Sequence, residues 1–64
     1  MVVSEKEALY HIQHEEQLYE WKQISKSTLE VHLQNFLDIL REYNEDKAEE
    51  ELKRLNRKYG FNMS

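Results

Sequence analysis

The feature that most limits what this chain can fold into is the near-absence of proline and glycine. The 64 residues contain no proline and one glycine, Gly60, so the residues that usually end helices and build tight turns are almost absent. Hydrophobic residues recur at spacings of three and four rather than two, which favours helices over strands. The sequence therefore predicts an all-α protein, and the ends of its helices have to be located from capping residues.

Two stretches carry the capping box, in which a serine hydroxyl accepts a hydrogen bond from a backbone amide three residues later. Ser4 with Glu7 is the first of them, and Ser27 with Glu30 is the second. In each case the glutamate can reach back to the serine amide, so two otherwise unpaired donors are satisfied. We predict that the first helix starts at Ser4 and the second at Ser27.

The third helix is separated from the second by a shift in the apolar pattern. Asn44 and Asp46 lie at this shift, and both residue types are favoured N-caps. Gly60 suits the left-handed residue that commonly ends a helix. These signals predict three helices, at about residues 4–23, 27–43 and 46–59.

Each predicted helix has an apolar stripe that can face a common core. The stripes are Ala8, Ile12 and Tyr19 with Leu9; then Leu29, Leu33, Phe36, Leu40 and Tyr43; then Ala48, Leu52, Leu55 and Tyr59. Residues 1–64 are therefore expected to form a single small helical bundle.

A chain of this length buries only a limited core. A 60-residue domain removes about 60% of its unfolded surface from water, and the absence of cysteine leaves no disulfide or thiolate metal site to add stability. Association with another chain would bury more apolar surface, so we expect a homodimer. The formal charge of −4 disfavours nonspecific binding to nucleic acid.

The composition does not predict attachment to a membrane. No apolar run approaches the ~20 residues of a spanning helix, and charged residues make up 34% of the chain. Residues 1–4 are too short a segment to be a signal peptide. Because no cysteine indicates an oxidising compartment either, we expect a cytoplasmic protein.

The first predicted helix carries more apolar residues than one core can bury. Tyr10, Leu18, Trp21 and Ile24 lie roughly opposite the stripe of Ala8 and Ile12. One explanation is that the helix bends or ends near residue 22, so that Trp21 and Ile24 cover the bottom of the core. The other is that the four residues meet another protein, because Trp and Tyr are frequent interface anchors.

The sequence predicts neither enzymatic activity nor a cofactor. The serines and Thr28 are better explained as caps, and no glycine-rich loop is present to hold a phosphate. His11 and His14 could share a metal with Glu15 or His32, but their order is not that of zinc proteases or di-iron bundles. We therefore expect no metal site and treat the histidines as surface residues.

A partial match to a known domain covers about residues 18–43. The matching features are an aliphatic residue in the turn, a serine beside it, a threonine cap and two apolar residues of the next helix, namely Ile24, Ser25, Thr28, Leu29 and Leu33. This stretch resembles the turn and recognition helix of helix-turn-helix domains in LuxR-type and Mga-type regulators. The resemblance implies DNA recognition by the helix beginning at Ser27. The DNA-contacting residues that it implies are Lys26, Ser27, Glu30, Gln34 and Asn35.

Two functions follow from these features, and a third possibility is a piece of a larger assembly, such as a coiled-coil or scaffold segment. The first is a small cytoplasmic regulatory protein of the inhibitor, antirepressor or adaptor type, which binds a larger protein and forms a homodimer through Tyr10, Leu18, Trp21 and Ile24. The alternative is a helix-turn-helix transcriptional regulator. We favour the first, because Lys22 and Gln23 replace the apolar residue and the glycine of the helix-turn-helix pattern, and because the first helix is acidic where it would approach phosphates.

Overall fold

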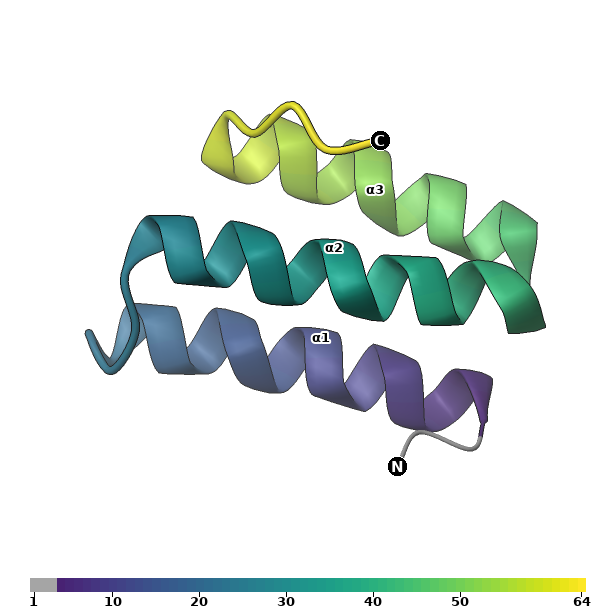
Figure 1. The fold of residues 1–64 in the computed structure, drawn as a ribbon, viewed down its shortest axis with the longest axis horizontal. Helices are drawn as coiled ribbons and strands as arrows, with labels where there is room; N and C mark the ends of the chain where they lie inside the picture. The colour runs from purple at the N-terminus through teal and green to yellow at the C-terminus, as the bar shows by residue number, and fades with distance from the viewer. Residues whose placement is uncertain (1–3) are drawn as a thin grey trace.

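The computed structural model describes residues 4–64 and contains three α-helices (Figure 1). They are α1 (Glu5–Glu20), α2 (Lys26–Tyr43) and α3 (Glu45–Tyr59). The predicted all-α bundle of three helices is thus confirmed. Residues 1–3, which belong to the segment predicted above to be too short for a signal peptide, lie outside the described residues.

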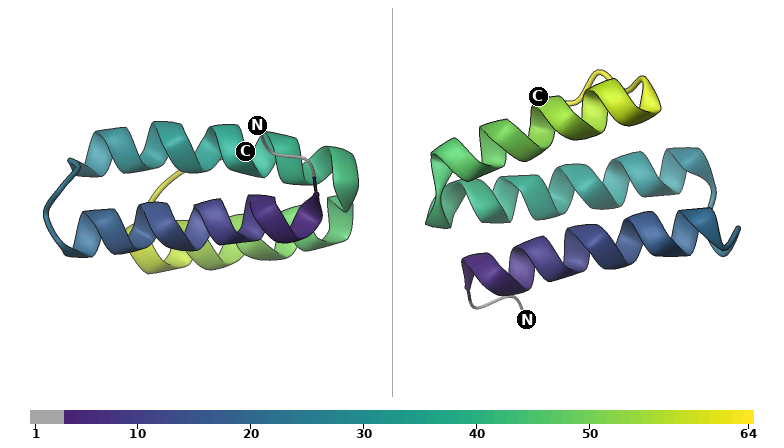
Figure 2. Two further views of the ribbon diagram at one scale, coloured as in Figure 1. Left: turned by 90° about the horizontal axis from the view of Figure 1, so that it is seen from below. Right: turned by 180° about the vertical axis from the view of Figure 1, so that it is seen from behind.

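The middle helix of the chain is also the middle helix of the bundle. α2 packs against both α1 and α3 and runs antiparallel to them (Figure 1). Figure 2 shows α1 and α3 on the same side of α2, so the three helices form a bent layer with extents of 29 × 23 × 13 Å. The inside of this bend holds the core, and each helix keeps an outer face in contact with solvent.

The core is built mainly from the predicted stripes, but Leu9, Tyr19 and Tyr59 are only half-buried at its edge, and the stripe of α2 needs a correction. The buried hydrophobic residues are Ala8, Ile12, Leu29, Leu33, Leu37, Leu40, Ala48, Leu52, Leu55, Phe61 and Met63. Leu37 takes the place predicted for Phe36 and Tyr43, because α2 has to face two helices and its buried stripe points between them. Phe36 is half-buried at the edge of the core, and Tyr43 is exposed.

All three helices begin at a side-chain cap, although not always at the predicted residue. The Ser4 hydroxyl accepts from the Glu7 amide as expected, at 3.2 Å. At α2 the prediction of Ser27 as the cap is wrong, because the Ser25 hydroxyl accepts from the Thr28 amide at 3.2 Å. Asn44 is extended and caps α3, so α2 and α3 are separate helices.

The first helix ends at Glu20 rather than residue 23, because Lys22 adopts a left-handed conformation with φ of 60°. The Lys22 amide donates to the Tyr19 carbonyl and the Gln23 amide donates to the Leu18 carbonyl, at 3.0 and 2.9 Å. This pair of bonds defines a Schellman motif, in which glycine normally supplies the left-handed residue. The predicted left-handed Gly60, with φ of 74°, ends α3.

After α3, residues 61–64 run back along the bundle and complete the core. The carboxamide of Asn56 pairs with both backbone groups of Met63, accepting from its N–H at 2.9 Å and donating to its carbonyl at 3.0 Å. Gln34 of α2 pairs with Ser64 in the same way, at 3.2 and 2.6 Å. These bonds hold the segment in place while Phe61 and Met63 insert into the core.

Within the part of the chain that the structure describes, none of the helices is long and apolar enough to cross a membrane.

Candidate functional site

The outer face of α1 presents the largest exposed aromatic side chains of the protein. Tyr10, His14, Gln17 and Trp21 follow one another at spacings of four, three and four residues, which places them on one side of a helix. Tyr10 is 63% exposed and Trp21 is 60% exposed. The ring of Tyr10 stacks on that of His14, with centroids 6.1 Å apart. This set of four residues, of which Trp21 is the C-cap residue directly after the helix, is here called the α1 outer face and lies opposite the buried stripe of α1.

The structure divides the four residues that were predicted to form an interface. Tyr10 and Trp21 belong to the α1 outer face, whereas Ile24 is half-buried and packs against the core. Leu18 is also half-buried, and its carbonyl accepts the Schellman bond from Gln23. The early end of the helix therefore separates Trp21, which is exposed, from Ile24, which covers the bottom of the core.

The candidate metal ligands are occupied by other contacts along the junction of α1 and α2. His11 stacks on Phe36 with ring centroids 4.9 Å apart and planes 7° from parallel. Glu15 is bonded to His32 through one carboxylate oxygen and the ring Nδ1. Among the described residues, no three His, Cys, Asp or Glu side chains come together in a way that could hold a metal ion.

A carboxylate that the sequence did not single out joins α1 to α3. Glu16 is only 7% exposed. It accepts two hydrogen bonds from the Arg54 guanidinium, at 2.9 and 3.3 Å, one from Lys58 at 3.1 Å and one from the Tyr59 hydroxyl at 3.0 Å. Arg54 is held in turn by Glu51 of its own helix, at 2.9 Å. Side chains thus bridge two helices that both pack on α2.

The ionisation of this cluster follows from its contacts. Burial acts to raise the pKa of Glu16, but the hydrogen bonds from Arg54, Lys58 and Tyr59 outweigh it and hold the pKa below the ordinary value. Glu16 in turn raises the pKa of Lys58. Burial and the hydrogen bond to Glu16 together raise the pKa of the Tyr59 phenol. Glu16 is therefore a charged structural link at neutral pH.

The sequence carried a partial signal for this link. Glu16 continues the buried positions of Ala8 and Ile12 at the same four-residue spacing, so it lies in the core stripe of α1. A carboxylate at such a position requires a partner, because an unpaired buried charge is strongly unfavourable. Its three partners on α3 are 38, 42 and 43 residues away in sequence, so only the fold identifies them.

The residues implied in DNA contact lie on two sides of α2. Ser27 and Asn35 are exposed. Gln34 is bonded to the backbone of Ser64, and the Lys26 ammonium lies 5.7 Å from the centre of the Phe61 ring. Glu30 is half-buried and lines the same hollow as Lys26 and Phe61. The segment after α3 therefore engages part of the proposed recognition face.

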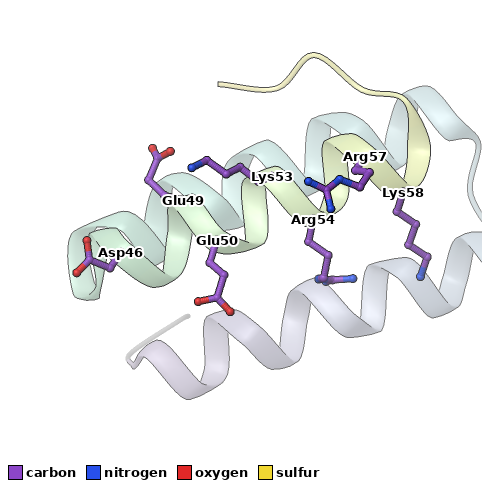
Figure 3. Close-up of a pocket in the computed structure, with 7 residues that line it drawn as sticks. All are labelled: Asp46, Glu49, Glu50, Lys53, Arg54, Arg57 and Lys58. Atoms are coloured by element: carbon purple, nitrogen blue, oxygen red, sulfur yellow. The ribbon is translucent and has the colours of Figure 1, made fainter.

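Charged side chains lie along one side of α3 (Figure 3). Seven side chains line an open hollow along it, namely Asp46, Glu49, Glu50, Lys53, Arg54, Arg57 and Lys58. The acidic residues lie at the beginning of the helix and the basic residues at its end. This order suits the helix dipole, since anions are stabilised at a helix N-terminus and cations at its C-terminus.

Comparison with protein-family models, with curated proteins and with solved structures finds no match to this chain. Function is therefore inferred from the surfaces themselves.

Proposed function

We propose that the protein acts by binding other proteins, as a small regulatory protein of the inhibitor, antirepressor or adaptor type. The observation that carries this proposal is the exposure of Tyr10 and Trp21, at 63% and 60%, on a helix that already buries its opposite face in the core. Trp and Tyr are enriched among the residues that dominate binding energy at interfaces. We propose the cytoplasm as the compartment and two kinds of partner, a larger protein and a second copy of the chain.

The spacing of the two aromatic residues defines what the larger partner has to offer. Trp21 lies eleven positions after Tyr10 in the sequence, which corresponds to about 16 Å along an α-helix. His14 and Gln17 lie between them and supply polar groups. The α1 outer face therefore suits a groove about three helical turns long, with an apolar pocket near each end and hydrogen-bonding groups between, as in helix-in-groove recognition.

Alanine substitution with a matched control tests this proposal. We expect Trp21→Ala or Tyr10→Ala to weaken capture of the partner by roughly tenfold or more, because truncation of an interface anchor costs more than about 1 kcal/mol. Val31→Ala is the control, because Val31 is also 60% exposed but lies on α2. The measurement is quantitative affinity capture from the native host, with each variant first shown to be folded by circular dichroism. Equal recovery of every partner with Trp21→Ala, Tyr10→Ala and the control would contradict the proposal.

DNA binding through α2 is the alternative proposal, and it has less support from the geometry. The helices of a helix-turn-helix cross at about 90–120°, whereas α1 and α2 run side by side and antiparallel (Figure 1). Lys26 and Gln34 are also engaged by residues 61–64. The alternative predicts duplex binding that weakens steeply with salt and on Gln34→Ala. A mobility shift against random and genomic DNA at low salt tests it, and no shift would exclude it.

A further inference from the structure

The outer side of α3 carries a stripe of four charged residues whose signs change once along the helix. Asp46, Glu50, Lys53 and Arg57 follow one another at spacings of four, three and four, opposite the buried Ala48, Leu52 and Leu55. These four residues are here called the α3 stripe. The first two are acidic and the last two are basic. The two signs occupy separate halves of the helix in Figure 3.

Most of the charge on the α3 stripe is not neutralised by the side chains of residues 4–64. Asp46, Lys53 and Arg57 make no ion pair with any residue between 4 and 64. Glu50 approaches Lys47 at 3.6 Å, and its side chain is 71% exposed.

The i,i+4 pairs that the sequence offers along α3 are not formed. Glu49 is directed to Arg41 of α2, at 3.6 Å, rather than to Lys53. Arg54 is bonded to Glu16 and Glu51 rather than to Glu50. Glu49 and Arg54 therefore contact groups outside the α3 stripe, and the charges of the stripe remain available for an external partner.

We propose that the α3 stripe is a self-association surface and that its partner is the α3 stripe of a second copy, packed antiparallel about a two-fold axis. In that arrangement Asp46 faces Arg57 of the second copy and Glu50 faces its Lys53. The two-fold axis repeats both contacts, so every stripe residue meets an opposite charge.

Only one orientation of two such helices satisfies the charges. A parallel arrangement would place Asp46 against Asp46 and Arg57 against Arg57, and like charges in close contact are unfavourable. A uniformly acidic partner, such as a nucleic-acid backbone, would be repelled by Asp46 and Glu50. A uniformly basic partner would be repelled by Lys53 and Arg57. The second copy matches the stripe along its full length.

This inference rests on the proposed function as a protein-binding protein. It deepens that function by assigning self-association to the α3 stripe, in place of the residues predicted for it from the sequence, which were Tyr10, Leu18, Trp21 and Ile24. The α1 outer face and the α3 stripe are on different helices, so the protein can engage a larger partner and a second copy at once. Exposed ion pairs are individually weak and are screened by salt. We therefore expect a weak dimer whose dissociation constant rises roughly tenfold between low and high ionic strength.

Charge reversal with complementation tests the proposal. One variant carries Lys53→Glu and Arg57→Glu, so that its stripe is all acidic, and the other carries Asp46→Lys and Glu50→Lys, so that its stripe is all basic. Each is expected to remain monomeric alone, because its stripe repels itself. An equal mixture is expected to form a heterodimer at least as tightly as the unmodified protein forms its dimer. Sedimentation velocity at low salt measures the three cases.

Two controls separate this surface from the rest of the protein. Glu42→Lys reverses one exposed charge on α2 and is expected to leave self-association unchanged. Trp21→Ala is expected to leave it unchanged as well, because Trp21 lies on the α1 outer face. The proposal is overturned if the unmodified protein is monomeric at low salt, if the mixture of variants stays monomeric, or if self-association is lost with Trp21→Ala instead. Partner capture through Trp21 is measured independently, so the proposed function can hold or fail separately.

Discussion

Replacing Glu16 with glutamine should reveal how much the link between α1 and α3 contributes to stability. Glutamine keeps the size of the side chain but removes the charge and one acceptor oxygen. Four hydrogen bonds from Arg54, Lys58 and Tyr59 converge on the native carboxylate. In Glu16→Gln, the side-chain NH₂ would take the place of one carboxylate oxygen. This group is itself a donor, so it could not accept the hydrogen bonds that this oxygen accepts in the native protein.

The expected loss can be bounded from the structure. Removing one member of a buried ion pair costs about 3–5 kcal/mol. The side chains of Arg54 and Lys58 remain 40% and 46% exposed, so both regain water, and Arg54 keeps Glu51. Solvent screening reduces the figure, and we expect Glu16→Gln to lower the free energy of unfolding by about 2 kcal/mol. For a domain of this size that corresponds to a Tm lower by roughly 8–16 °C.

The effect should depend on pH in a defined direction. The pKa of Glu16 is lower in the folded protein than the ordinary 4.5 of a glutamate. Its contribution to stability is therefore fully present above the pKa of the unfolded chain and is lost as the pH falls through the lower pKa of the folded protein. The difference between the unmodified protein and Glu16→Gln should be constant near neutral pH and should shrink below a pH of about 4.5.

Thermal unfolding followed by far-ultraviolet circular dichroism measures both effects. Glu20→Gln is the control, because Glu20 is an exposed glutamate one turn further along α1. A Tm for Glu16→Gln equal to that of the unmodified protein would refute this assignment of the link. So would an equal loss in Glu20→Gln, or a difference that persists unchanged in acid.

Three further predictions concern local structure. Lys22→Gly should stabilise the protein by about 1 kcal/mol, because glycine adopts the left-handed conformation without the strain of a Cβ atom. Gly60→Ala should destabilise it by a similar amount in urea unfolding, because alanine is strained at the left-handed φ of 74°. The added methyl group meets no neighbour within 4 Å, so no clash adds to this strain. Ser25→Ala should cost about 1 kcal/mol and Ser27→Ala much less in the same assay, because Ser25 is the cap of α2; equal effects would contradict this assignment. Asn56→Ala should cost about 1–3 kcal/mol by removing both bonds to the Met63 backbone, and faster hydrogen exchange of the Met63 amide should accompany it, whereas unchanged exchange would refute the proposed restraint.

Local signals in the sequence located most of the architecture, because they act over a single helical turn. The Ser4 cap and the left-handed Gly60 were predicted from capping chemistry and are present in the structure. The break before α3 was predicted from the shift in the apolar pattern, with Asn44 and Asp46 as candidate caps, and the structure has Asn44 as the cap. The cap of α2 was predicted wrongly at Ser27, because Ser25 and Ser27 both offer a hydroxyl three residues before a possible helical partner. The hydrogen bond from Thr28 selects Ser25.

The features that could not be predicted depend on contacts between distant residues or on conformations without a residue signature. A lysine gives no indication that it will be left-handed, so the end of α1, which is at Glu20, was predicted too late, at residue 23. The link between Glu16 and α3 joins residues 38 positions apart and more. The aromatic candidates were found from spacing alone, but only the fold separates exposed Trp21 from half-buried Ile24.

The environment of the only tryptophan is the most direct test of protein binding through α1. Trp21 is the single tryptophan of the chain and is 60% exposed in the protein alone, so its fluorescence should be that of a hydrated indole and should be quenched readily by iodide. When a captured partner is added, we expect its emission to shift to shorter wavelength and its quenching to fall, provided that the partner lacks tryptophan or that its tryptophans are replaced. An emission and a quenching constant that stay unchanged in the saturated complex would show that Trp21 remains in water, and would contradict binding through the α1 outer face.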